Sequence, residues 1–152
     1  MRKIVYGLMI FLVAVILTGC GSKEIKVYSE ENLEEFNEIL TNIGDGKTKA
    51  YDLRVYEECY SGRIPGFYCS RVEDIQDETE ALDRVIYNLT LLLGDKKRTL
   101  IILIDNDGEN SDYVSKKLFD QGYSNVHYFK DGYERYVELQ DGFIPETGEC
   151  DC

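Results

Sequence analysis

The apolar run from Thr99 to Ile104 constrains the fold more than any other segment of the chain. An unbroken run of this length, rich in isoleucine, is typical of a strand that is covered on both faces inside a parallel sheet. Apolar residues at helical spacing precede it over 77–93 and follow it from Ser111 to Gly122. This alternation of strand and helix predicts an α/β layered fold with a mostly parallel central sheet flanked by helices.

Weaker patterns extend this alternation along the rest of the chain. A helix is expected from Ser29 to Ile43, with Ser29 as its N-cap, and a helix is expected over 131–139. Short strands are expected over 50–53 and 125–129. No internal repeat is present, and the chain length suits one domain with a single core.

The first 20 residues predict export. Two basic residues, Arg2 and Lys3, precede an apolar segment, Ile4 to Leu17, and small residues stand before Cys20. The apolar segment is shorter than the ~20 residues that a membrane-spanning helix needs. Leu17-Thr18-Gly19-Cys20 resembles a bacterial lipobox, which implies a diacylglyceryl group on Cys20. An uncleaved anchor and an ordinary secretory signal are the alternatives.

The lipobox divides the chain into four parts: a lipoprotein signal peptide (1–19), a lipidated N-terminus with a short linker (20–28), one domain (29–140) and a C-terminal tail (141–152). The expected location is therefore outside the cytoplasm, with attachment to the cell membrane through the lipid. Lipoprotein-processing enzymes are the first partners that this location implies.

The net charge excludes one class of partner. Removal of the signal peptide leaves 15 of the 17 basic residues against 29 acidic ones, a formal charge of −14. A surface of that charge repels nucleic acid and anionic lipid headgroups. We therefore expect no nucleic-acid partner, and we expect the lipid to provide the membrane attachment.

Four further cysteines stand at Cys59, Cys69, Cys150 and Cys152. An even number in an oxidising compartment predicts disulfides, but three full pairings are possible and the sequence does not choose among them. A bridge from Cys59 or Cys69 to the tail would close a long loop, whereas a Cys150–Cys152 bridge would close a small ring. A redox-active pair or a soft-metal site in the tail is the alternative to a structural bridge.

Four segments carry a family resemblance. Asp52-Leu53-Arg54, followed by Glu58-Cys59-Tyr60-Ser61-Gly62-Arg63-Ile64-Pro65-Gly66, resembles the rhodanese homology domain, which has Asp-x-Arg and then Glu-x-Tyr-x-x-Gly-His-Ile-Pro-Gly. Only the histidine is changed, to Arg63. Later in the chain, Gly122-Tyr123-Ser124-Asn125-Val126 and Asp131-Gly132-Tyr133 are similar to two turns of the family. The resemblance runs from about Ile25 to Leu139 and implies the same single α/β domain.

The resemblance places the active loop at Asp105-Asn106-Asp107-Gly108-Glu109-Asn110-Ser111. In active members the loop begins with a cysteine that carries sulfur, and backbone N–H groups stabilise its anionic forms. Here that position is Asp105, and a carboxylate cannot carry a sulfane sulfur. Asn110 stands where the family often has arginine, and the acidic residues would repel thiosulfate. We therefore expect a vestigial loop with no catalytic residue and no cofactor.

Asp105 is expected instead to accept the N–H groups of the loop and so to replace the missing anion. A cation site formed by Asp105, Asp107 and Glu109 is an alternative, since hard cations prefer oxygen ligands, but the spacing does not fit an EF-hand. We therefore predict no metal site.

The stretch from Asp105 to Gly108 also resembles the first motif of haloacid-dehalogenase-type phosphatases, in which two aspartates and magnesium act together. Glu109 stands where that family has threonine, and little chain follows to supply its later motifs.

The sequence predicts a lipid-anchored protein whose rhodanese-like domain is catalytically inactive and acts as a binding or regulatory module for a protein or small molecule. The alternative is a thiol-dependent redox or sulfurtransferase enzyme that uses a cysteine outside the loop (Cys59, Cys69, Cys150 or Cys152). Acidic neighbours of the first two would raise the pKa of a free thiol. His127, the single histidine, is expected to be a packed or surface residue rather than a base.

Overall fold

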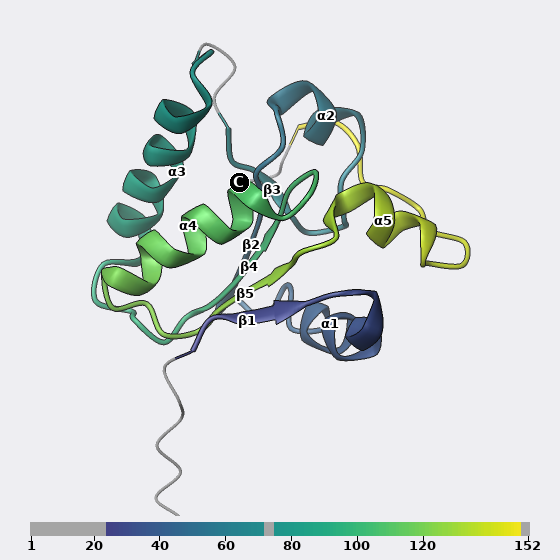
Figure 1. The fold of residues 1–152 in the computed structure, drawn as a ribbon, viewed down its shortest axis with the longest axis horizontal. Helices are drawn as coiled ribbons and strands as arrows, with labels where there is room; N and C mark the ends of the chain where they lie inside the picture. Colours follow the sequence, from purple (N-terminus) through teal and green to yellow (C-terminus); the bar gives the residue numbers. More distant parts are fainter. Residues whose placement is uncertain (1–23, 72–74, 150–152) are drawn as a thin grey trace, which may run out of the picture.

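The computed structural model describes residues 24–71 and 75–149 (Figure 1). Its centre is a parallel sheet of five strands in the order β1-β5-β4-β2-β3. The strands are β1 (Lys26–Tyr28), β2 (Thr48–Asp52), β3 (Tyr68–Cys69), β4 (Leu100–Ile104) and β5 (Val126–Phe129). The helices are a 3-10 turn η1 (Glu30–Asn32), α1 (Leu33–Leu40), α2 (Tyr56–Ser61), α3 (Glu78–Leu93), α4 (Glu109–Asp120) and α5 (Gly132–Glu138).

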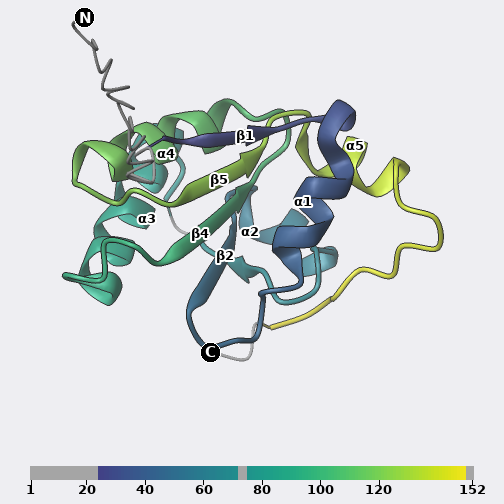
Figure 2. The same ribbon diagram turned by 90° about the horizontal axis from the view of Figure 1, so that it is seen from below.

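Helices cover both faces of the sheet (Figures 1 and 2). α3 and α4 pack on one face, where Ile101 and Leu103 of β4 enter the first core cluster. α1 and α5 lie on the other face, where Ile102 and Ile104 enter the second cluster. Successive side chains of a strand point to opposite faces, so a strand between two cores is apolar at every position. The predicted α/β fold is confirmed.

Three elements were not predicted from the sequence. β1 lies in the segment assigned to the linker, yet Lys26 pairs with His127 of β5 and joins the sheet. α2 and β3 lie in the stretch that was expected to contain only turns. Each of the three is six residues long or shorter. Segments so short show too few repeats of a hydrophobic period to be recognised.

Two helices begin at positions other than those expected. The chain from Ser29 first forms η1, in which the Ser29 side chain accepts a hydrogen bond from the Glu31 N–H, and α1 then ends at Leu40. α4 begins at Glu109, two residues before the expected Ser111. Its N-cap, Gly108, has a φ of +88°, a left-handed conformation that glycine adopts without strain.

His127 is a packed residue of β5 with 5% of its surface exposed. Its Nδ1 lies 3.0 Å from the Tyr28 hydroxyl and its Nε2 lies 2.8 Å from Oδ1 of Asn125. Burial, with a smaller contribution from Lys26, lowers the pKa of His127 to about 4. The imidazole is therefore neutral at pH 7, and it hydrogen-bonds within the fold.

Because the strands are parallel, the loops that follow them lie along one edge of the sheet, formed by the carboxyl ends of the strands, and the loops that precede them lie along the opposite edge. β2 and β4 end together, with Asp52 opposite Ile104, so the loops that carry Asp52 and Asp105 meet at one edge. The first residues of β1, β2, β4 and β5 lie at the other edge. Within residues 24–71 and 75–149, no helix has the length and apolarity to cross a membrane. Cys20, Cys150 and Cys152 lie outside the described residues.

Candidate functional site

The loop that follows β4 closes around the carboxylate of Asp105. This side chain is 1% exposed. Its Oδ1 accepts hydrogen bonds from the Gly108 N–H at 3.0 Å and the Ser111 hydroxyl at 2.6 Å, and its Oδ2 accepts one from the Asn110 N–H at 2.8 Å. These are the contacts expected of a carboxylate that fills an anion-binding loop from within.

Burial raises the pKa of Asp105 above its ordinary value, because the charged form loses hydration. The hydrogen bonds from Ser111 and Asn110 act in the opposite direction, and the neighbouring charge of Asp107 raises the pKa further. Both carboxylate oxygens are engaged inside the loop. A carboxylate held in this way is a structural acceptor, and it is not exposed for attack on a substrate.

The loop after β5 packs directly against this loop. A Cβ on Gly108 would lie 2.3 Å from the Lys130 carbonyl oxygen, and a Cβ on Gly132 would lie 1.8 Å from the Asn106 carbonyl oxygen. The Tyr133 N–H donates to the Asp105 carbonyl oxygen at 2.8 Å. Only glycine fits at these two positions, so the backbone conformation of the Asp105 loop is fixed by its neighbour.

The Asp52-x-Arg54 pair forms a buried framework beside the loop. Arg54 Nη2 donates to Asp52 Oδ2 at 2.6 Å and to the Gly62 carbonyl oxygen at 2.6 Å. The guanidinium group also lies over the Tyr133 ring, 3.5 Å from its centroid. Burial raises the pKa of Asp52, although Arg54 opposes the shift. Arg54 thus joins β2, the end of α2 and α5, and its Nε and Nη2 atoms are hydrogen-bonded within the protein.

The remaining acidic residues of the loop do not converge. Asp107 is exposed and its Oδ1 accepts a hydrogen bond from the Glu109 N–H at 3.1 Å, while Glu109 is itself exposed. Within the described residues, no three histidine, cysteine, aspartate or glutamate side chains lie close enough together to hold a metal ion. Asn106 donates to Glu58 Oε2 at 3.2 Å.

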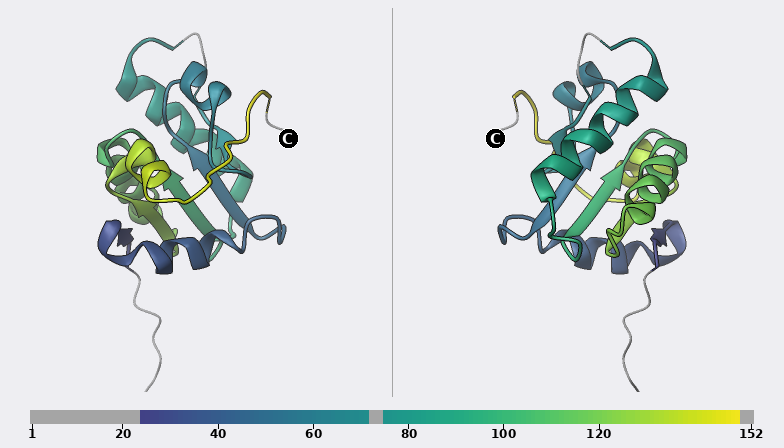
Figure 3. Two further views of the ribbon diagram at one scale, coloured as in Figure 1. Left: turned by 90° about the vertical axis from the view of Figure 1, so that its right-hand side faces the viewer. Right: turned by 90° about the vertical axis from the view of Figure 1, so that its left-hand side faces the viewer.

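Arg63, the residue before Ile64-Pro65-Gly66, attaches the C-terminal tail. It is fully buried, and its guanidinium donates to Glu146 Oε1 at 2.5 Å and to the Gly148 carbonyl oxygen at 2.6 Å. The backbones of Arg63 and Glu146 also exchange two hydrogen bonds. Oε2 of Glu146 accepts a hydrogen bond from the Gly66 N–H at 2.7 Å. One carboxylate therefore binds both Arg63 and Gly66, at the two ends of the Arg63–Gly66 turn. Figure 3 shows the segment after α5 crossing back toward α2 and β3.

The structure contains one of the disulfides that the sequence left open, between Cys59 and Cys69. It joins α2 to β3, with a Cα–Cα distance of 5.6 Å, and closes the turn that contains Arg63. Cys59 is fully buried and Cys69 is half-buried. Arg63 Nη1 lies 4.0 Å from Cys69 Sγ. Sequence reasoning could not find this pairing, because it depends on how β3 pairs with β2.

Cavities in the described part of the chain lie away from the Asp105 loop, and two of them have distinctive linings. A cavity of about 360 Å³ beside Cys69 has a largely apolar wall from the face of α3. A cavity of about 620 Å³ lies at the opposite edge of the sheet and is lined by basic side chains. Neither cavity was predicted from the sequence, since the residues that line each one come from separate segments.

The fold and the loop define a class of protein: a single α/β domain in which the loop after the central strand closes around a buried carboxylate. The model of the rhodanese-like domain matches residues 35–139, and the chain belongs to this family. Among solved structures, the Alr3790 protein from Anabaena sp. is similar, with a TM-score of 0.55 and 16% identity over 72% of this chain and 79% of that one. The human single-domain sulfurtransferase TSTD1 is also similar, with a TM-score of 0.52 and 15% identity over 76% of this chain and 97% of that one.

At these identities the two structures support the fold alone. No curated protein matches the chain. The family relates this domain to sulfurtransferases, and the chemistry of this chain has to be argued from its own loop.

Proposed function

We propose that this protein is an extracytoplasmic lipoprotein whose rhodanese-like domain does not transfer sulfur and serves as a binding or regulatory module. The observation that carries the proposal is Asp105 itself. It occupies the start of the loop, is 1% exposed, and takes the N–H groups that a thiolate or persulfide would need. Sulfur transfer through the loop needs a nucleophilic sulfur at this position, and a carboxylate has none.

Electrostatics support the same conclusion. Asp107 and Glu109 are exposed at the mouth of the loop, and Asn110 supplies no positive charge there. An anionic sulfur donor such as thiosulfate would approach a region of like charge, which lowers its affinity. Arg54, a nearby cation, is bound to Asp52 and Gly62 and is 6% exposed. The loop thus lacks both the nucleophile and an accessible counter-charge.

The proposed test is a thiosulfate:cyanide sulfurtransferase assay on a chain that begins at Gly21, which retains every described strand and helix. We expect no turnover, with the thiols either reduced or oxidised. The human relative described as a sulfurtransferase serves as the positive control. Turnover by the reduced protein would contradict the proposal.

Lipid anchoring is supported by the order of basic, apolar and small residues before Cys20. Two acyl chains on this residue would give stable attachment, whereas one would not. Replacing Cys20 by serine should abolish both lipid labelling and removal of residues 1–19. A Cys150→Ser variant, which leaves the lipobox intact, is the matched control and should be labelled normally. Normal processing of the Cys20→Ser chain would refute the lipobox assignment.

A thiol-dependent enzyme is the second candidate, and one observation favours it. Arg63 contacts Cys69 Sγ at 4.0 Å and also binds the carbonyl oxygens of Gly148 and Glu149, the last residues before Cys150. A guanidinium beside a sulfur favours its thiolate form after reduction. Turnover in the assay only after reduction, lost in a Cys69→Ser variant, would support this candidate over the first.

A further inference from the structure

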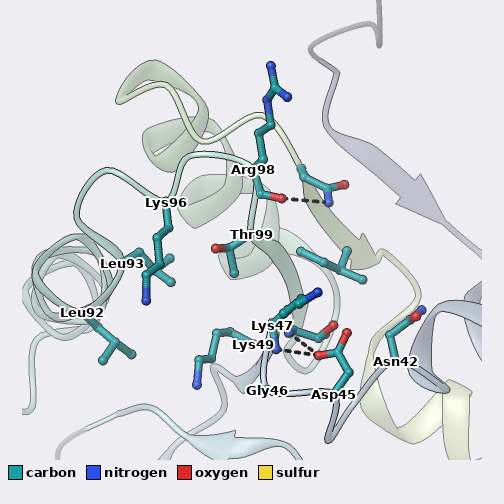
Figure 4. A pocket seen from close by; sticks show the side chains of 13 residues that line it. Asn42, Asp45, Gly46, Lys47, Lys49, Leu92, Leu93, Lys96, Arg98 and Thr99 are labelled. Carbon is teal, nitrogen blue, oxygen red and sulfur yellow. Dashed lines mark hydrogen bonds between the residues drawn. The ribbon is translucent and has the colours of Figure 1, made fainter.

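A basic pocket lies at the edge of the sheet opposite the Asp105 loop (Figure 4). It has a volume of about 620 Å³ and is formed mainly by the segments before β2 and before β4. Its charged lining consists of one acidic residue, Asp45, and four basic ones: Lys47, Lys49, Lys96 and Arg98. The formal charge of the whole chain is −12, so this pocket reverses the sign of the charge locally.

Asp45, the single carboxylate of the pocket lining, cannot neutralise four cations. Its Oδ1 accepts hydrogen bonds from the N–H groups of Lys47 and Thr48, each at 2.7 Å, and its charge acts on Lys47. The ion pairs among the described residues involve other basic side chains. Lys47, Lys96 and Arg98 are exposed. A group of exposed cations that outnumbers the neighbouring carboxylates attracts an anionic surface.

The chain enters the domain at this same edge. Lys26, the first residue of β1, pairs with His127, which pairs with Ile102 of β4, so the parallel strands begin side by side. β1 lies two strands from β4, a lateral distance of about 10 Å. Cys20 precedes Lys26 by six residues, which span at most ~20 Å when fully extended.

We infer that this edge, defined by Lys47, Lys49, Lys96 and Arg98, docks on the anionic headgroups of the membrane that holds Cys20. The inference rests on the proposed lipid anchor. A tether of this length keeps the edge at high effective concentration near the bilayer, so weak contacts suffice. Salt at physiological strength screens the acidic remainder of the domain beyond about 8 Å.

Docking by this edge orients the domain so that the Asp105 loop is on the side away from the membrane. The five residues of β4 separate the basic edge from Asp105 by about 16 Å. With the basic edge on the membrane, the Asp105 loop and the Cys59–Cys69 disulfide face away from it. The net charge alone predicted repulsion from anionic lipid, and the clustering of these cations in space removes that objection.

The experiment uses the lipidated full chain in vesicles of phosphatidylcholine, with or without phosphatidylglycerol. An amine-reactive reagent followed by mass spectrometry measures the accessibility of each lysine. We expect labelling of Lys47, Lys49 and Lys96 to fall at least threefold when phosphatidylglycerol is present. Labelling of Lys116 and Lys130, which lie outside the pocket, should not change. Equal protection of all lysines, or none in the pocket, would overturn the inference.

Two triple variants with the same change in net charge provide the matched comparison. Lys47→Glu/Lys96→Glu/Arg98→Glu removes cations from the pocket, while Arg84→Glu/Lys117→Glu/Lys130→Glu removes exposed cations elsewhere. Each cation near an anionic membrane contributes about 1 kcal/mol, and each 1.4 kcal/mol changes an equilibrium constant about tenfold. The docking of the basic edge on phosphatidylglycerol vesicles should therefore be about a hundredfold weaker in the first variant. Protection of Lys49 should be lost there and kept in the second variant. Equal loss in both variants would overturn the inference.

Two further measurements distinguish failure of this inference from failure of the proposed anchor, and distinguish a membrane-docking edge from a site for a small anion. The mass of the N-terminal peptide reports lipidation, so a chain without lipid refutes the anchor independently. In that case, protection of Lys47 by phosphatidylglycerol vesicles on the chain from Gly21 would still support the basic edge. Inorganic phosphate without vesicles, at matched ionic strength, should give no protection. Equal protection by phosphate would assign the pocket to a small anion and overturn membrane docking.

Discussion

Replacing Asp105 by alanine is expected to destabilise the domain by about 3–5 kcal/mol. The change leaves the N–H groups of Gly108 and Asn110 and the hydroxyl of Ser111 without their acceptor. An unsatisfied buried donor costs about 1–3 kcal/mol, and the hydroxyl can recover part of its loss by rotation. Urea unfolding of both proteins at pH 7 measures the difference.

The matched control is Asp107→Ala in the same loop. Asp107 is exposed and accepts a single hydrogen bond, from the Glu109 N–H, so its loss should change the free energy of unfolding far less. If the two variants unfold at the same urea concentration, the carboxylate of Asp105 does not organise the loop. The structural basis of the proposed inactivity would then be lost.

The pH dependence of an Asp105→Asn variant tests the charge on this group. Because burial raises the pKa of Asp105, its ionisation is less favourable in the folded chain than in the unfolded one. Its contribution to stability is full below about pH 4 and is lost as the pH rises through the folded pKa. Asparagine cannot ionise, so Asp105→Asn should cost less stability at pH 7 than at pH 3. A larger cost at pH 7 would show that the carboxylate is stabilised by ionisation.

Replacing Arg63 by alanine should cost about 3 kcal/mol and release the C-terminal tail. Arg63 is fully buried, and it binds Glu146, Gly148 and Glu149 while its backbone pairs with Glu146. Truncation removes these charge-assisted hydrogen bonds and leaves a cavity beside the Cys59–Cys69 disulfide. Urea unfolding measures the loss of stability. Limited proteolysis, with cleavage after residue 142, reports release of the tail.

Arg135→Ala is the control for loss of an arginine charge. Arg135 pairs with Glu30 and Glu138 on the surface, where ion pairs contribute little, so this variant should keep the wild-type midpoint and resist cleavage of the tail. An Arg63→Ala protein with an intact, protected tail would mean that the other contacts of residues 143–149 suffice. Arg63 would then have no part in holding the segment before Cys150.

Much of this fold could be predicted from the sequence because its signals are local. The apolar run of β4 specified a doubly covered strand, and the apolar face of α3 specified a packed helix, since both patterns repeat over several residues. The role of Asp105 as an acceptor also followed locally, from a carboxylate at a strand end before a loop. β1 escaped prediction, because a three-residue edge strand is stabilised by its pairing with β5.

The sequence by itself determined the family and the layered fold, and it places an aspartate, Asp105, directly after β4. The family and fold depend on residue identity and spacing, and the match to the rhodanese-like domain over 35–139 agrees with them. Tertiary structure alone decided which cysteines pair, that Arg63 holds the tail, and that Lys47 and Lys96 share one pocket. Each of these depends on contacts between segments distant in the chain. Strand order and register fix such contacts, and no local pattern encodes them.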